Sequence, residues 1–173
     1  MQCCRMANSG KPYTFRLLRS EILYDVENYA FIEGDIMPDE SEDAKHQVID
    51  VAQDGNIDRV SRVMNLAYTE CVEMLYPFTK KAVEEKDTDD TLRCPEEYVI
   101  TGTFPASFSQ STADLLQNQL HEYVVYRILA DWFSIVKPDS ASNWEKKLEK
   151  IRNKIKTSMS IRRGKTRRGM SPF

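Results

Sequence analysis

Apolar residues that recur every three or four positions restrict the fold of this chain more than any other feature of its sequence. The clearest stripe lies between residues 57 and 78 and consists of Ile57, Val60, Met64, Ala67, Cys71, Met74 or Leu75, and Phe78. This spacing puts the apolar side chains on one face of a helix, and that face has to be buried against other elements. Pro77 is expected to end or kink the helix.

Two further helices are expected in the first third of the chain. Helical spacing over residues 14–32 gives the stripe Phe15, Leu18, Ile22, Val26 and Tyr29. Gly34 is expected to stop this helix, because glycine often follows the last helical turn. A second helix is expected over residues 41–53, since the turn residues Asp54, Gly55 and Asn56 follow it.

Two more helices are expected in the last third. The longer one follows Pro105, takes Ser109, Ser111 or Thr112 as its N-cap and reaches about Val136. Apolar residues on more than one of its sides predict that it is the central helix of the fold. The last helix takes Asp139 or Ser140 as its cap, and its apolar stripe is Trp144, Leu148, Ile151, Ile155 and Met159.

One segment has a different period. Tyr98, Ile100, Gly102 and Phe104 alternate with Val99, Thr101 and Thr103, which predicts a β-strand. Residues 90–94 are expected to pair with it across Pro95 and Glu96 as a hairpin that protrudes from the helices. An isolated hairpin is marginal in water. We therefore expect residues 90–104 to contact a neighbouring subunit through Tyr98, Ile100 and Phe104. Gly102 predicts a bulge or a close backbone contact.

These patterns predict a mainly α fold, a small helical bundle of about four to five helices with a short β-hairpin and extended terminal arms. Residues 1–12 are expected to form a flexible leader and residues 13–159 the helical domain, with its hairpin near 90–104. Residues 160–173 are expected to form a basic C-terminal arm.

Charge is divided unevenly along the chain. Residues 144–173 contain eleven Lys and Arg residues against two Glu residues, a net charge of +9, while the whole chain carries −3, so the remainder carries −12. Such asymmetry bears on partners rather than on the fold. The arm is expected to meet either nucleic acid or an acidic protein surface, including the acidic body of a neighbouring copy. A merely solvated tail is the alternative.

The candidate binding residues of the arm are Arg162, Arg163, Lys165, Arg167, Arg168 and Phe173. Proteins that stack on single-stranded nucleic acid interleave aromatic and basic residues, whereas Phe173 is the only ring in this segment. Pro172 and Phe173 are more typical of an anchor for a protein pocket. The arm is therefore expected to dock onto another protein, with its arginines as charge contacts.

Motifs for catalysis, metals and cofactors are missing. His121 and Glu122 begin a zinc-protease pattern, but Val125 stands where the second histidine is required. No glycine-rich phosphate loop and no serine nucleophile motif is present. The four cysteines have no paired spacing, which is typical of a reduced intracellular protein. The sequence predicts no enzyme, no cofactor, no metal site and no membrane span.

Two charged residues, Arg127 and Asp131, stand four positions apart within the apolar long helix. Charges among apolar residues need partners. The two residues are expected to pair with each other or with a charge on a neighbouring element.

The order of elements resembles the small, mainly helical head–tail connector (adaptor) proteins of tailed bacteriophages. This order is helices, a charged loop, a short hairpin, a long helix, a shorter helix and a cationic arm. The segments 17–26 (LLRSEILYDV) and 121–132 (HEYVVYRILADW) are also similar to uncharacterised proteins encoded by phages and prophages of gut anaerobes. The resemblance covers about residues 15–173.

The resemblance implies a structural virion protein in the phage neck, assembled in the cytoplasm of the bacterial host. It implies a homo-oligomeric ring of roughly twelve copies, bound beneath the portal protein and above the next neck or tail protein. The arm would reach into the portal, and the body would line the channel through which DNA passes without sequence-specific contact.

The alternative function is a nucleic-acid-binding protein that uses its basic tail for phosphate contacts. A third and weaker possibility is a helical regulatory protein that binds another protein through a helix face.

Overall fold

The computed structural model describes residues 10–38, 42–76, 78–81, 89–105 and 108–161, without the side chains of Ser160 and Ile161. Within these residues the protein is mainly α-helical, with five α-helices and one two-stranded antiparallel sheet, as the sequence predicted. In chain order the elements are β1 (Lys11–Leu18), α1 (Arg19–Asp35), α2 (Glu42–Ile49), a 3-10 turn (Asp50–Ala52), α3 (Ile57–Met74), β2 (Glu97–Phe104), α4 (Gln110–Val136) and α5 (Pro138–Ile161).

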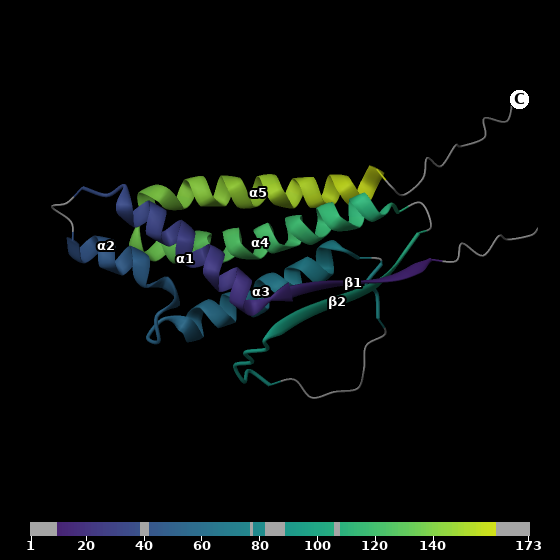
Figure 1. The fold of residues 1–173 in the computed structure, drawn as a ribbon, viewed down its shortest axis with the longest axis horizontal. Helices are drawn as coiled ribbons and strands as arrows, with labels where there is room; N and C mark the ends of the chain where they lie inside the picture. Colours follow the sequence, from purple (N-terminus) through teal and green to yellow (C-terminus); the bar gives the residue numbers. More distant parts are fainter. Residues whose placement is uncertain (1–9, 39–41, 77, 82–88, 106–107, 162–173) are drawn as a thin grey trace, which may run out of the picture.

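Helix α4 is the centre of the fold. Figure 1 shows α5 running along one side of α4 and α3 lying on the other side, while α1 starts near the middle of the molecule and crosses α4 toward the left-hand end. The α4 helix buries residues on several of its sides, as expected for a central helix. It begins where predicted, because the Ser109 side chain accepts a hydrogen bond from the Thr112 backbone N–H at 3.3 Å.

The predicted stripes of α3 and α5 are the buried faces of those helices. In α3 the buried residues include Val60, Met64, Ala67 and Cys71. In α5 they include Trp144, Ile151, Ile155 and Met159. The Trp144 ring stacks on Phe133 of α4, with 5.6 Å between the ring centroids, so the start of α5 is fixed against the end of α4.

The strand pairing differs from the sequence prediction. The strand β2 pairs with β1 and not with residues 90–94, in the register Phe15↔Ile100 and Leu17↔Tyr98. Residues 14–18 are therefore strand, and the first helix starts at Arg19 instead of residue 14. The physical reason is local: buried Phe15 and Leu17 alternate with exposed Thr14 and Arg16, which is a period of two.

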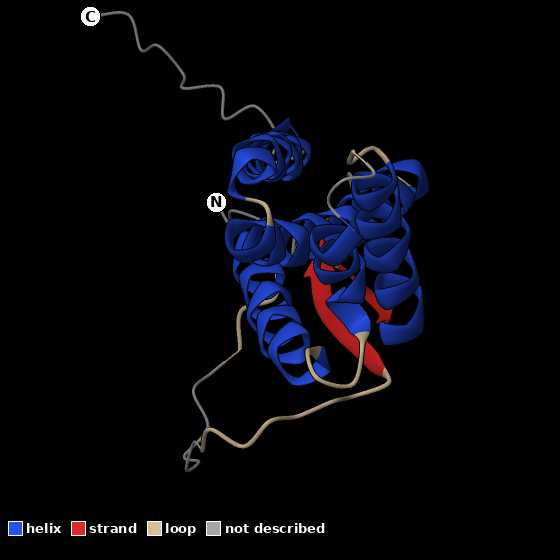
Figure 2. Ribbon diagram, turned by 90° about the vertical axis from the view of Figure 1, so that its left-hand side faces the viewer, coloured by secondary structure: helices blue, strands red, loops and turns tan. Residues whose placement is uncertain are grey.

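The two strands do not protrude from the helices. The end-on view in Figure 2 shows them, in red, lying among the helices. One face of the ribbon is apolar and buried, so the bundle itself supplies the cover that a two-stranded ribbon requires. Lys11 and Pro12, assigned to the leader from sequence, belong to β1, and residues 1–9 lie outside the described residues.

Gly34 does not stop α1, since the helix continues to Asp35. A Cβ atom at Gly34 would lie 2.8 Å from Cγ1 of Ile49 in α2, closer than carbon atoms approach. Glycine here lets α2 pack directly against the last turn of α1. The predicted second helix is split accordingly, with α2 ending at Ile49 and a 3-10 turn following it.

Candidate interaction surfaces

The arm residues proposed from sequence, Arg162, Arg163, Lys165, Arg167, Arg168 and Phe173, lie outside the described residues. The helix that precedes them continues to Ile161, two residues into the predicted arm. Its C-terminal end lies at the same end of the molecule as the beginning of β1 (Figure 1). What the structure describes of the basic region is therefore the surface of α5.

The residues predicted to contact a neighbouring subunit are buried within their own chain. Tyr98, Ile100 and Phe104 are 4%, 2% and 3% exposed. The Tyr98 hydroxyl donates to Oδ1 of Asn65 at 2.7 Å, which fixes β2 on α3. Phe104 lies 5.6 Å from Phe15, measured between ring centroids. The reason given for an intersubunit role, a lack of cover, is wrong, because β1 and α3 cover these side chains.

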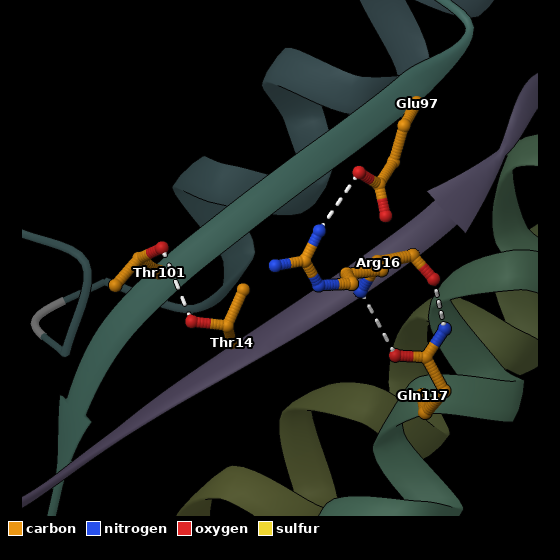
Figure 3. Close-up of polar contacts among 5 residues, drawn as sticks. All are labelled: Thr14, Arg16, Glu97, Thr101 and Gln117. Atoms are coloured by element: carbon orange, nitrogen blue, oxygen red, sulfur yellow. Dashed lines mark hydrogen bonds and ion pairs between the residues drawn. The ribbon is translucent and has the colours of Figure 1, made fainter.

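The outer edges of the ribbon are partly occupied. Figure 3 shows the Gln117 side chain of α4 against the edge of β1. Its amide nitrogen donates to the Arg16 carbonyl at 2.6 Å, and its oxygen accepts from the Arg16 N–H at 3.2 Å. On the edge of β2, the Tyr68 hydroxyl donates to the Val99 carbonyl at 2.8 Å. Thr103 N–H donates to the Phe78 carbonyl at 2.9 Å. Edge groups satisfied in this way are poor templates for another strand.

The outward face of the ribbon is mostly polar, although Leu18 and Val99 on this face are also exposed. Nη1 of Arg16 lies 2.8 Å from Oε2 of Glu97, and the hydroxyls of Thr14 and Thr101 lie 3.4 Å apart (Figure 3). These are cross-strand pairs of the kind that stabilise exposed sheet faces by a few tenths of a kcal/mol to about 1 kcal/mol each. Such polar pairs are compatible with a ribbon face that is in contact with water and not with another protein.

The two charged residues of α4 pair with α3 and not with each other. Arg127 Nε lies 3.5 Å from Oε2 of Glu70, and Asp131 Oδ2 lies 2.9 Å from Nη2 of Arg59. The second of the two predicted alternatives is therefore correct. Each pair joins α3 to α4, but the side chains are partly exposed, so each pair contributes about 0–1 kcal/mol to their packing.

Tyr123 joins the same contact. Its hydroxyl donates to Oε2 of Glu70 at 2.7 Å. Burial, followed by the hydrogen bond and the negative charge of Glu70, raises the pKa of Tyr123. Burial is also the main cause that raises the pKa of Tyr126 to about 12, with the charge of Glu122 adding to it. Both phenols stay protonated near neutral pH, so they act as hydrogen-bond donors and not as bases.

A partly buried polar contact closes the junction of α1, α4 and α5. Nζ of Lys137 lies 2.9 Å from Oε2 of Glu33, and the Ser140 hydroxyl donates to the same oxygen at 3.2 Å. Burial alone would raise the pKa of Glu33, but the bonds from Lys137 and Ser140 and the charge of Lys137 outweigh it and lower this pKa. His121 makes a similar contact between helices, with Nε2 2.8 Å from Oδ2 of Asp25.

No enclosed catalytic or metal-binding site is evident among the described residues. A pocket of about 210 Å³ lies between the ribbon and the start of α4, lined mainly by Tyr13, Phe15, Phe104 and Phe108. No group of three or more His, Cys, Asp or Glu side chains suited to a metal ion occurs among the described residues. That the protein is not an enzyme stays a prediction.

Sequence reasoning missed the outward face of α1. Tyr24 and Phe31 are 62% and 58% exposed, and Ile32 and Ile36 are also exposed. The signal was available, because apolar residues occur all around this helix and its inward stripe accounts for only some of them. Exposed rings at positions i and i+7 lie on one line along a helix.

No protein-family model, no curated protein and no solved structure matches this chain. Among the described residues, no helix has both the length and the apolar character required to cross a bilayer.

Proposed function

We propose that the chain is a structural virion protein, a head–tail connector (adaptor) subunit that forms a homo-oligomeric ring under the phage portal. The observation that carries the proposal is the division of charge between a basic C-terminal region, +9 over residues 144–173, and an acidic remainder of −12. A protein that surrounds moving DNA benefits from an acidic body, because like charges repel and the DNA does not adhere. The basic arm suits docking onto an acidic neighbour.

The architecture supports this proposal in a second way. The bundle has a large buried apolar core, sheet edges that are partly covered, and pairs of charges that join its helices. Such a body suits a structural subunit. The surfaces left for interaction are helix faces and the C-terminal extension, which suit contacts with other subunits.

The proposal is tested by co-expressing the chain with the portal protein of the same phage genome. The expected result is a complex whose mass, measured by light scattering, corresponds to a portal ring carrying a ring of this chain. Mass spectrometry of purified virions is expected to find the chain in an amount comparable to the portal protein. Its absence from virions would reject a structural role.

The basic tail keeps one alternative open, a nucleic-acid-binding protein. Such a protein binds DNA with an affinity that falls steeply with salt, by roughly one power of the salt concentration per phosphate neutralised. Binding that persists at physiological salt, by a chain that does not join the portal, would favour this alternative. The connector proposal expects weak DNA binding, since most of the molecule is acidic.

A further inference from the structure

The outward face of α1 combines acidic and apolar side chains. Its residues, at helical spacing, are Glu21, Tyr24, Glu27, Phe31, Ile32 and Asp35, and all six are exposed. We call this set the α1 outer face. It lies opposite Ile22, Val26 and Ala30, which are buried. Among the described residues the three carboxylates of this face form no ion pair, and no basic residue interrupts it.

Helix α5 has a surface of opposite charge. Lys146, Lys147, Lys150 and Lys154 follow one flank of the helix, and all four are exposed. We call them the lysine stripe. Lys150 and Lys154 line a shallow depression of about 400 Å³, with Gln119 of α4 in its wall. Lys146, Lys150 and Lys154 form no ion pair within the part of the chain that the structure describes.

Lysine side chains also suit exposed aromatic rings. Their alkyl stems cover apolar surface while the ammonium groups stay in water or meet a carboxylate. The chain already contains such a contact, since Nζ of Lys147 lies 3.6 Å from the centre of the Trp144 ring. A lysine stripe placed on Tyr24 and Phe31 would repeat this contact and bring ammonium groups near Glu27 and Asp35.

We infer that the lysine stripe of one copy binds the α1 outer face of the next copy. The occupant of each surface is a second copy of this chain, because the chain supplies both charges and the rings between the carboxylates. Nucleic acid would explain the lysine stripe alone and would leave Tyr24 and Phe31 exposed. The inference rests on the proposed ring and names the contact that builds it.

We take the contact to be heterologous, so that the two surfaces of one copy bind two different neighbours. A C2 pair would exchange the same contacts between only two copies. Each copy can offer its lysine stripe to one neighbour and its α1 outer face to another. Such interfaces close into rings when the rotation between neighbours permits and otherwise give open filaments. A C2 dimer would stop at twice the mass of the chain, whereas a ring exceeds that mass, so sedimentation distinguishes the two arrangements.

Two pairs of charge reversals test the contact. One variant carries Glu27→Lys and Asp35→Lys, and the other carries Lys146→Glu and Lys150→Glu. Each brings like charges together, so self-association measured by sedimentation at low salt is expected to weaken at least about tenfold. Mixing the two variants restores opposite charges at every contact and is expected to restore association. Circular dichroism and thermal melts verify that both variants are folded.

A matched control separates this contact from general electrostatics. Asp54→Lys with Glu73→Lys raises the net charge by the same amount as Glu27→Lys with Asp35→Lys, on exposed residues outside both surfaces. It is expected to leave association within about twofold of the unmodified chain. The double variant Tyr24→Ser with Phe31→Ser tests the apolar part of the contact and is expected to weaken association as strongly as the charge reversals. Its control is Leu66→Ser, since Leu66 is an exposed leucine on α3 outside both surfaces. This control is expected to leave association unchanged.

Several results would overturn the inference. The first is that the unmodified chain stays monomeric at about millimolar concentration. The second is that the charge reversals weaken self-association no more than the control does. The third is that a mixture of the two reversed variants does not associate. Loss of DNA binding on Lys146→Glu with Lys150→Glu, with self-association intact, assigns the stripe to nucleic acid. These results leave the virion test unaffected, and absence from virions would reject the connector proposal while leaving the solution contact in place.

Discussion

Gly102 shows how closely one residue can be constrained by its neighbours. A Cβ atom there would lie 2.9 Å from the Phe104 ring and 3.1 Å from the Phe78 carbonyl oxygen. That oxygen accepts the hydrogen bond from Thr103 N–H, so it is held in place. Of the two roles predicted for this glycine, close backbone contact is correct, and the unbroken strand register leaves no room for a bulge.

Gly102→Ala is therefore expected to destabilise the protein by about 1–3 kcal/mol, the usual cost of overpacking a filled site. Gly55→Ala is the matched control, because no atom lies within 4 Å of a Cβ placed there. Urea unfolding of both variants measures the difference. Equal stability of the two variants would mean that β2 adjusts to the added methyl group.

Glu33 gives a prediction about pH. Burial raises the pKa of Glu33, but the hydrogen bonds from Lys137 and Ser140 and the charge of Lys137 outweigh burial, so this pKa lies below its ordinary value of 4.5. A carboxyl group with a lowered pKa contributes stability above its unfolded pKa, and this contribution is lost as the pH falls through the folded pKa. The free energy of unfolding of the unmodified chain is expected to exceed that of Glu33→Gln at pH 7. The difference should shrink below about pH 4.5. A difference that does not change with pH would argue against the contact with Lys137.

The ribbon shows the limits of sequence reasoning at the scale of elements. Stripes of period 3.6 predicted α3, α4 and α5 because each helix is long enough to repeat its pattern several times. The strand β1 is short, and its Phe15 and Leu18 fitted equally well into the helical stripe of the segment that follows. Pairing between residues 11–18 and 97–104 joins segments far apart in the chain, which no local pattern reveals.

The same limit applies to the sites. The charge division and the pairing needs of Arg127 and Asp131 were predicted from sequence, because charges can be counted and assigned to helix positions. The burial of Tyr98, Ile100 and Phe104 was not predicted, since it depends on β1 and α3. The α1 outer face was missed although its signal was available, because the predicted inward stripe of Ile22 and Val26 left Tyr24 and Phe31 on the other side of the helix.

Tyr98 and Ile100 are accordingly expected to matter for folding. Ile100→Ser and Tyr98→Ser each remove a buried apolar side chain, with an expected loss of about 2–5 kcal/mol. Val99→Ser, on the opposite face and 38% exposed, is expected to cost far less. Denaturant unfolding measures all three. If the first two variants kept their stability and lost only assembly, the intersubunit role predicted from the sequence would be restored.

At the scale of the whole molecule, charge is arranged by element and not only by position in the chain. The lysine stripe of α5 continues the basic character of residues 162–173 into the folded body, while α1 presents carboxylates outward. A ring built from such copies can use the stripe between its own subunits and keep the arm for another protein. The two basic regions would then have separate tasks, which separate variants can test.

A chain that ends at Ile161 is expected to keep the stability of the full chain, because the apolar core described for α5 reaches only to Met159. It is also expected to retain self-association through the lysine stripe while losing most of its affinity for the portal protein.

Replacing Phe173 by Ser should weaken portal binding without changing the net charge, which tests the ring as an apolar anchor. Neutralising Arg162, Arg163, Arg167 and Arg168 should weaken portal binding and reduce its dependence on salt, since fewer charge contacts remain. Calorimetry with purified portal at two salt concentrations measures both effects. If the Phe173 variant binds the portal normally while the arginine variant loses only DNA binding, the arm serves nucleic acid, and the charge division no longer supports the connector.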